Sequence, residues 1–275
     1  MYPYFVIDLG EHLRLGLYDI CLMIAILSCL VLYRVFADRQ KFKARIQNFA
    51  LIAILFSIGG GYYAAALVQT FYNWNAALAS NPEAKFWDYW GTGATFYGGL
   101  VGGVLIFLVL YFGIGTLLFK DKKNLHYFFP IANIAGAVIP LAHGIGRIGC
   151  LMAGCCHGAR SDAWYAIPMN IPGDGTSDMV KVVPVQLFEA LFLLALAAFL
   201  LFSFWKKWRY QMPIYMIAYS LWRFVAEYLR DDYRGQTVIK ALTPSELVSV
   251  VLLVGGIALL AVELWLDHRK GGREA

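Results

Sequence analysis

The sequence has few charged residues for its length. Charged side chains make up 15% of the 275 residues, whereas soluble domains carry about 25%. The apolar residues form long runs instead of amphipathic stripes, and residues 95–119 include no charged side chain. A helix that crosses a bilayer needs about 20 such residues. This pattern excludes an ordinary soluble globular domain and predicts a membrane protein.

The sequence also lacks a disulfide framework and a cleavable leader. Cys21 and Cys29 lie inside the first apolar run, where a disulfide-rich secreted domain would not place them. No basic leader or small-residue cleavage site flanks that run, so we expect it to remain as a span. The net charge of +5 comes from short basic clusters between apolar runs. Such clusters are typical of membrane flanks, so we expect no nucleic-acid partner.

Seven apolar runs are long enough to cross a bilayer as helices. They are residues 15–36, 49–71, 95–119, 127–153, 185–205, 213–229 and 246–266. We therefore predict an all-α membrane protein with seven transmembrane helices, which form a single membrane domain over residues 1–275. Residues 154–184, between the fourth and fifth spans, are rich in Gly, Pro, Asp and Ser. We expect this segment to form a small external cap.

Lys and Arg residues are distributed unevenly between the two sets of connecting loops. Fourteen, including Arg34 at the end of the first span, lie in or beside the loops after spans one, three and five and in the C-terminal segment, and seven lie in the other set. Short cytoplasmic loops carry the excess of basic residues. We therefore expect the N-terminus outside the cell membrane and the C-terminus in the cytoplasm.

Several ionisable residues fall inside predicted spans or at their ends, where a charge costs roughly 2.5–3.5 kcal/mol. They are Asp19, His143, Arg147, Glu189, Arg223 and Glu227. Three sets share a helix face by their spacing, namely Arg223 with Glu227 and Arg230, His143 with Arg147, and Gln186 with Glu189. In the predicted topology these sets converge in the outer half of the bundle, beneath the cap.

Two arginines that face one cavity indicate a site for a phosphate group. A guanidinium is a planar fork that matches phosphate geometry, and at this depth the phosphate would belong to a phospholipid head. For Arg223 and Glu227 alone, the alternative to a phosphate site is an ion pair that only stabilises the fold. A small transporter or channel would also carry charges inside the membrane. No internal repeat of the kind found in transporters is present.

Residues 143–158 are rich in glycine and cysteine. No strand precedes them, which excludes a dinucleotide-binding loop. A metal site is conceivable from Cys150, Cys155, Cys156, His143 and His157, but their spacing matches no zinc pattern. We expect no metal, and we also expect no cofactor. A reactive thiol stays open, and packing of small polarizable side chains where a helix breaks is favoured. In the third span, Gly98 and Gly99 indicate close helix packing, with Tyr97 as a phenol that could point into the site.

The chain resembles the bacterial prolipoprotein diacylglyceryl transferase family at these residues. The segment that carries the resemblance is residues 146–158, Gly-Arg-Ile-Gly-Cys-Leu-Met-Ala-Gly-Cys-Cys-His-Gly. Further stretches are similar to the family's other motifs and occur in the same order, at residues 96–102, 184–189, 219–230 and 242–247. The resemblance covers about residues 15–266 and implies the same seven-span, N-outside topology.

The resemblance implies an enzyme of the bacterial inner membrane. Such enzymes move the diacylglyceryl group of phosphatidylglycerol onto the lipobox cysteine of a preprolipoprotein signal peptide, so a thioether forms and glycerol phosphate leaves. The implied catalytic residues are Arg147, Arg223, Glu227 and Tyr97. The expected substrate-binding residues are His143, Gly146, Gly98, Gly99, Gln186, Glu189 and Arg230.

A non-catalytic membrane paralogue that binds phospholipid or lipoprotein is the alternative. It is motivated by three positions at which this chain departs from residues often seen in the family. Leu15 stands in place of a tyrosine, Val183 in place of a histidine, and the segment around Gly61 lacks an arginine.

Overall fold

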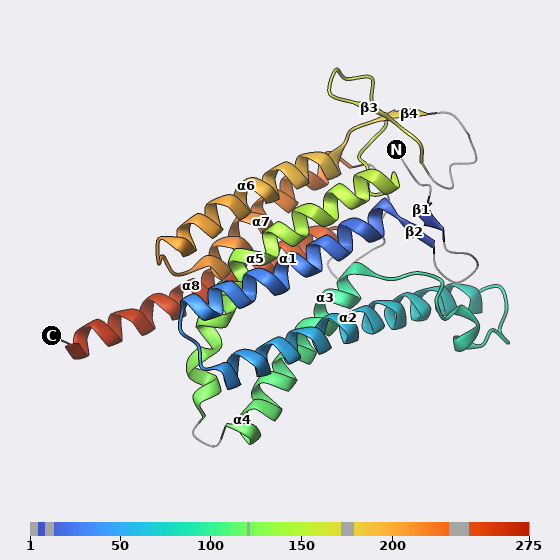
Figure 1. Ribbon diagram of the computed structural model, residues 1–275. Helices are drawn as coiled ribbons and strands as arrows, with labels where there is room; N and C mark the ends of the chain where they lie inside the picture. The colour runs from blue at the N-terminus through green and yellow to red at the C-terminus, as the bar shows by residue number, and fades with distance from the viewer. Residues whose placement is uncertain (1–4, 9–13, 120–121, 172–178, 231–241, 275) are drawn as a thin grey trace. The chain divides into compact units, whose positions relative to one another are not determined.

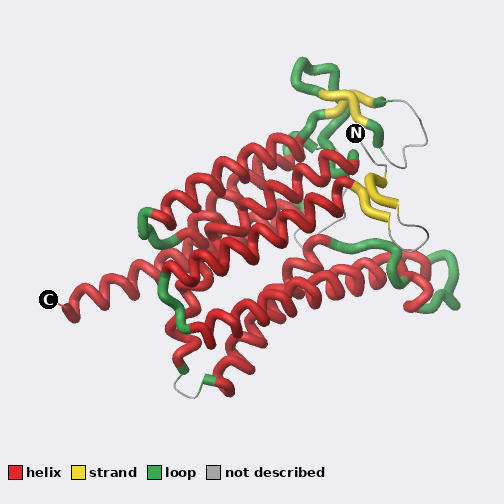
Figure 2. The backbone as a smooth tube through the Cα atoms, viewed as in Figure 1, coloured by secondary structure: helices red, strands yellow, loops and turns green. Residues whose placement is uncertain are grey.

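The computed structural model describes residues 5–8, 14–119, 122–171, 179–230 and 242–274, and these residues are mostly helical (Figures 1 and 2). The α-helices are α1 (Leu17–Arg39), α2 (Ala44–Leu78), α3 (Phe96–Leu108), α4 (Gly115–Leu118), α5 (Lys123–Ala153), α6 (Val185–Trp205), α7 (Gln211–Glu227) and α8 (Pro244–Glu274). A 3-10 helix, η1 (Phe86–Tyr89), precedes α3, and a π-helical turn, η2 (Val109–Ile114), joins α3 to α4.

Six helical stretches of the described chain are long and apolar enough to cross a membrane. They are Leu17–Arg39, Ala44–Leu78, Phe96–Leu118, Lys123–Ala153, Val185–Trp205 and Pro244–Arg269. The prediction of a helical, multi-pass membrane protein is therefore confirmed. Helix α7 has 17 residues and is not among the six, so the seventh span and the orientation of the termini stay predictions.

The ends of α2 and α7 differ from the predicted ones. Helix α2 continues to Leu78, so residues 72–78 are helical although the sequence indicated a connector there. Helix α7 ends at Glu227, two residues before the predicted end, because the chain turns there through backbone bonds such as Arg230 N–H to Glu227 O at 3.1 Å. Arg230 therefore follows the helix and does not lie on the helical face of Arg223 and Glu227.

Two small antiparallel sheets accompany the helices, which the all-α prediction did not include. Strand β1 (Phe5–Asp8) pairs with β2 (Arg14–Gly16), and β3 (Ile167–Met169) pairs with β4 (Val180–Val182). The β3–β4 pair lies within the predicted cap, whose residues 172–178 are outside the described part of the chain. Alternation puts Met169 and Val182 on a buried face with Leu151 at the end of α5.

The chain forms two compact units, residues 37–131 and residues 1–36 with 132–275. The second of these is the larger unit. The prediction of a single domain over 1–275 stays a prediction. In the 37–131 unit, α2 and α3 pack through small residues. A Cβ added to Gly61 would lie 2.9 Å from the carbonyl oxygen of Gly99, so these two backbones approach without room for a side chain.

In the larger unit, α5 packs against α1, α6 and α7. Gly149 of α5 lies against Tyr18 of α1, and Gly144 lies against Leu194 of α6. The α6 and α7 segments lie beside α5 in Figure 1, and the β3–β4 pair lies beyond the end at which α5 finishes and α6 begins. Backbone bonds tie this end together, since Gly158 N–H donates to Val183 O at 2.8 Å and Ala159 N–H donates to Leu229 O at 3.2 Å.

Candidate active site

A buried carboxylate lies at the centre of the polar cluster of the larger unit. The Glu189 side chain, in the second turn of α6, is 1% exposed. Its Oε2 lies 3.0 Å from Nε of Arg147 on α5, and its Oε1 accepts a hydrogen bond of 2.9 Å from the Tyr219 hydroxyl on α7. The Arg147 N–H is not aligned on Oε2 as a hydrogen bond requires, so this contact is an ion pair. Three helices therefore meet at one carboxylate.

His143 joins the same cluster one turn before Arg147. Its Nδ1 lies 3.2 Å from the Tyr215 hydroxyl, and its Nε2 lies 3.8 Å from Glu189 Oε1. Its ring packs edge-on against Tyr219, with 4.7 Å between ring centroids. Sequence reasoning did not name the two tyrosines. They lie eight and four residues before Arg223 on α7, so the helical spacing that singled out Glu227 would also have found them.

The second arginine has partners on its own helix and at the start of α8. Arg223 is 5% exposed. Its Nη2 lies 2.7 Å from Glu227 Oε2 and donates a hydrogen bond of 2.6 Å to Ser245 Oγ. Thr243 and Glu246 form a capping box at the start of α8, with bonds of 2.8 and 3.2 Å between each backbone N–H and the other side chain. This cap fixes the turn that carries Ser245.

Both guanidinium groups keep donors beyond these contacts. Among the described residues, no group accepts a hydrogen bond from the buried Nη1 of Arg223. Glu189 contacts Arg147 at Nε, which leaves the two terminal nitrogens of that fork for another acceptor. Both positive charges lie within electrostatic range of Tyr219 and His143. The site therefore combines two cations with unused donors, which suits an anionic ligand with several oxygen atoms.

Two more predicted site residues hold the loop that follows α5. Gln186, which is fully buried, donates to the carbonyl oxygen of Cys155 at 3.1 Å. Arg230 donates through Nη1 to the carbonyl oxygen of Cys156 at 2.7 Å. The sequence predicted substrate binding for both, and that role stays a prediction. Their visible contacts position the loop beside the arginines.

Gly146, next to Arg147, borders open space. A Cβ added there would meet no atom within 4 Å, so a ligand that reaches Arg147 could lie against this backbone. Asp19, in contrast, is not part of the cluster, because its Oδ2 accepts the backbone N–H of Gly16 at 2.8 Å at the start of α1. It satisfies a helix-terminal donor, as acidic residues commonly do in a first turn.

Tyr97, Gly98 and Gly99 lie in the first turn of α3, in the 37–131 unit. A Cβ on Gly98 would collide with the Val68 side chain, and one on Gly99 would lie 3.2 Å from Ala65 Cβ. These contacts support the packing interpretation of the two glycines. The placement of Tyr97 beside the arginines stays a prediction.

Three thiols gather where α5 ends. The Sγ atoms of Cys150, Cys155 and Cys156 all lie within 4.8 Å of one another. The Cys155 thiol donates a hydrogen bond to the backbone carbonyl oxygen of Cys150 at 3.7 Å, and the Cys156 thiol lies within electrostatic range of Arg147 and Arg230. The sequence favoured packing of small polarizable side chains where the helix breaks, and the structure brings the three sulfur atoms together there.

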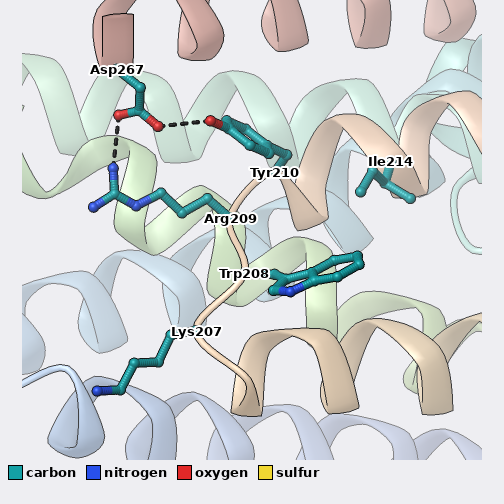
Figure 3. A pocket seen from close by; sticks show the side chains of 6 residues that line it. All are labelled: Lys207, Trp208, Arg209, Tyr210, Ile214 and Asp267. Atoms are coloured by element: carbon teal, nitrogen blue, oxygen red, sulfur yellow. Dashed lines mark hydrogen bonds and ion pairs between the residues drawn. The ribbon is translucent and has the colours of Figure 1, made fainter. Parts of the chain in front are cut away.

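A hollow at the α6–α7 connection is separate from this cluster (Figure 3). Asp267 of α8 forms an ion pair with Arg209 at 2.7 Å and accepts a hydrogen bond from Tyr210 at 2.8 Å. That hydrogen bond and partial burial raise the pKa of Tyr210 above 10.0. Helix α7 begins at Gln211, directly after Tyr210 of the hollow, and the rise along the helix from Gln211 to Arg223 is about 18 Å. The Arg209 side chain is 65% exposed, so this surface ion pair ties the connection to α8.

Known proteins are similar to this chain over nearly its whole length. Residues 5–262 match the family model described as prolipoprotein diacylglyceryl transferase. The chain is 31% identical to phosphatidylglycerol–prolipoprotein diacylglyceryl transferase 2 of Clostridium perfringens, over 98% of this chain and 99% of that protein. It is 28% identical to the corresponding transferase of Clostridium tetani, over 93% of this chain and 96% of that protein. The chain belongs to the prolipoprotein diacylglyceryl transferase family.

Proposed function

We propose that this protein transfers the diacylglyceryl group of phosphatidylglycerol to the lipobox cysteine thiol of preprolipoproteins. The observation that carries the proposal is the pair of arginines with unused donors, of which Nη1 of Arg223 is buried without an acceptor among the described residues. A buried donor of this kind costs free energy unless a ligand satisfies it. A phosphodiester head supplies the oxygen atoms and the negative charge that both arginines need.

The reaction exchanges a carbon–oxygen bond for a carbon–sulfur bond. The thiol sulfur attacks the glyceryl carbon that carries the phosphate, and the electron pair of the breaking bond goes to the phosphate oxygen. The thiol proton passes to water, and glycerol phosphate leaves with more negative charge than the phosphodiester had. Arg147 and Arg223 stabilise this developing charge, which is the usual role of preorganised donors in a transition state.

The acidic residues hold the arginines in place. Glu227 and Ser245 fix one Nη of Arg223, so its other Nη is directed at the ligand. Glu189 fixes Arg147 through Nε and leaves the flat end of the fork for the phosphate. Gly146 supports close approach because no side chain fills the space beside it. Tyr97 is a further candidate for contact with the reacting thiol.

We also propose the seven-span arrangement with the N-terminus outside, in the bacterial inner membrane. Helix α7 has 17 residues and spans about 26 Å, close to the hydrocarbon thickness of about 30 Å. The excess of basic residues in the loops after spans one, three and five supports this orientation. The arginine cluster and the cap then lie toward the outer leaflet, where a secreted lipoprotein precursor arrives.

A direct assay tests the proposal. The purified protein is mixed with phosphatidylglycerol and a peptide that contains a lipobox, and the mass of a diacylglyceryl adduct is sought. A peptide with serine in place of the cysteine is the control and should remain unmodified. An active wild-type protein would exclude the non-catalytic paralogue. The absence of adduct, under conditions where a known family member works, would refute the proposal.

A further inference from the structure

The end of α5 folds two cysteines onto each other. Gly154 follows the helix with a φ of +73°, a left-handed conformation that glycine adopts without strain. Its N–H donates to Leu151 O at 3.3 Å, and the Cys155 N–H donates to Cys150 O at 3.2 Å. This pair of bonds is a Schellman motif. It reverses the chain so that Cys155 returns to the helical turn that carries Cys150.

A third cysteine, Cys156, lies at the same place. Its backbone has an uncommon conformation, and side chains of the site hold the loop that carries it. Cys156 has a φ of +61°, which is uncommon for a residue with a side chain and is kept only where its surroundings enforce it. Arg230 donates to its carbonyl oxygen at 2.7 Å, and Gln186 donates to that of Cys155 at 3.1 Å. These hydrogen bonds therefore hold the loop in the conformation that brings the three sulfur atoms together.

The distances suit a metal ion. A zinc–thiolate bond of about 2.3 Å in tetrahedral geometry separates the sulfur atoms by about 3.8 Å. The three Sγ atoms lie within 4.8 Å of one another, so a shift of about 1 Å or less brings them to that separation. Three thiolates favour a soft or borderline ion. Their negative charge is partly balanced by Arg147 and Arg230, both of which lie close to Cys156.

We propose that Cys150, Cys155 and Cys156 bind one Zn²⁺ ion and leave its fourth coordination position for the lipobox thiol of the incoming peptide. Three protein ligands with one open position are typical of catalytic zinc sites. Cys155 is exposed, so the open side can be reached from outside the protein. The spacing of these cysteines predicted no metal, because it matches no common zinc pattern.

The second half of this proposal rests on the proposed function. When the thiol coordinates Zn²⁺ it releases its proton to water, and its sulfur remains nucleophilic as a zinc-bound thiolate. A sulfur lone pair then forms the bond to the glyceryl carbon, and the carbon–oxygen electron pair leaves with glycerol phosphate. The thioether product is a weaker ligand than a thiolate and dissociates. No oxidant or reductant is required.

Metal content tests the site without reference to activity. The full-length protein is purified in detergent with a reductant that does not bind metals, supplied with Zn²⁺, desalted, and analysed for zinc per chain. We expect one zinc in the wild type and at least a tenfold lower content in Cys155→Ser and Cys156→Ser. Cys21→Ser and Cys29→Ser, which change the two cysteines of α1, are the matched controls and should retain the metal.

Circular dichroism and size-exclusion profiles of the variants show whether each one is folded. Cys155→Ser changes an exposed side chain, so it should fold even if Cys150→Ser does not. A folded wild-type protein without zinc would overturn the proposal. A mass lower by two hydrogen atoms, which indicates a disulfide within the cluster, would also overturn it.

Cobalt substitution tests the open position. The Co²⁺-loaded protein should show a sulfur-to-metal charge-transfer band, which should increase when the lipobox peptide is added and stay unchanged with the serine peptide. An unchanged band with the cysteine peptide would refute thiol coordination and leave a structural metal. A metal-loaded protein that responds to the thiol but forms no adduct with phosphatidylglycerol would refute the proposed function alone.

Discussion

Arg147 and Glu189 allow the structural and catalytic roles of one arginine to be separated. Glu189 is 1% exposed and lies 3.0 Å from Arg147, so Arg147→Ala leaves a buried carboxylate without its counter-ion. Removal of one partner from a buried ion pair costs about 3–5 kcal/mol. We expect Arg147→Ala to lower the free energy of unfolding by about that amount and to abolish transfer.

The double variant Arg147→Ala/Glu189→Gln removes the orphaned charge. The glutamine keeps an oxygen that accepts the Tyr219 hydrogen bond, so we expect most of the lost stability to return. Transfer should stay at least about 100-fold below wild type, because the donor for the phosphate is still missing. Stability is measured by unfolding in detergent and transfer by the rate of adduct formation.

An exposed ion pair supplies the matched control. Arg209→Ala/Asp267→Asn breaks the pair at the hollow of Figure 3, whose side chains are 65% and 28% exposed, and should change stability by about 0–1 kcal/mol. Two results would contradict the reasoning about Arg147. If the double variant regained activity together with stability, Arg147 would serve only as the counter-ion of Glu189. If Arg147→Ala were as stable as wild type, the ion pair would not support the fold.

Three other substitutions give separate tests. Arg223→Lys should lower the transfer rate about 100-fold or more while the protein stays folded, because an ammonium group cannot contact Glu227 and a phosphate as a fork does. Gly146→Ala should stabilise α5 by about 0.5–1 kcal/mol yet raise the KM for phosphatidylglycerol, whereas Gly59→Ala, also in open space, should leave KM unchanged. Because the pKa of Tyr210 is raised above 10.0, its hydrogen bond stabilises the fold below pH 10 and is lost as pH rises through the raised pKa. Tyr210→Phe should therefore reduce the alkaline loss of stability seen in pH-dependent unfolding.

The sequence predicted those features that depend on one helix alone. Long apolar runs predicted the membrane helices, and the four-residue spacing of Arg223 and Glu227 predicted their contact, which the structure shows at 2.7 Å. Both follow from helix geometry, which does not depend on the neighbouring elements. The prediction about Arg230 was wrong in detail because it assumed that α7 continues past Glu227.

Contacts between helices were harder to predict. The sequence placed Arg147 and Glu189 in the same half of the bundle, but their pairing depends on the rotation of α5 and α6 about their axes. Small residues set that rotation. At Gly144, for example, an added Cβ would lie 3.0 Å from Cγ of Leu194. A glycine in a predicted span indicates that another helix packs closely against it, but the sequence does not identify that helix.

The cysteine cluster shows that a local rule can reveal a site that ligand spacing misses. Zinc patterns in sequences describe cysteines paired across short turns, and Cys150, Cys155 and Cys156 do not follow them. A glycine just after a helix, however, predicts a Schellman motif. In that motif the second residue past the helix end donates to the carbonyl five residues before it, as Cys155 does to Cys150 at 3.2 Å. A cysteine at both positions is therefore a local pair that the position of Gly154 specifies. Cys156, in contrast, is also held by a contact from outside the motif, the hydrogen bond from Arg230 to its carbonyl oxygen.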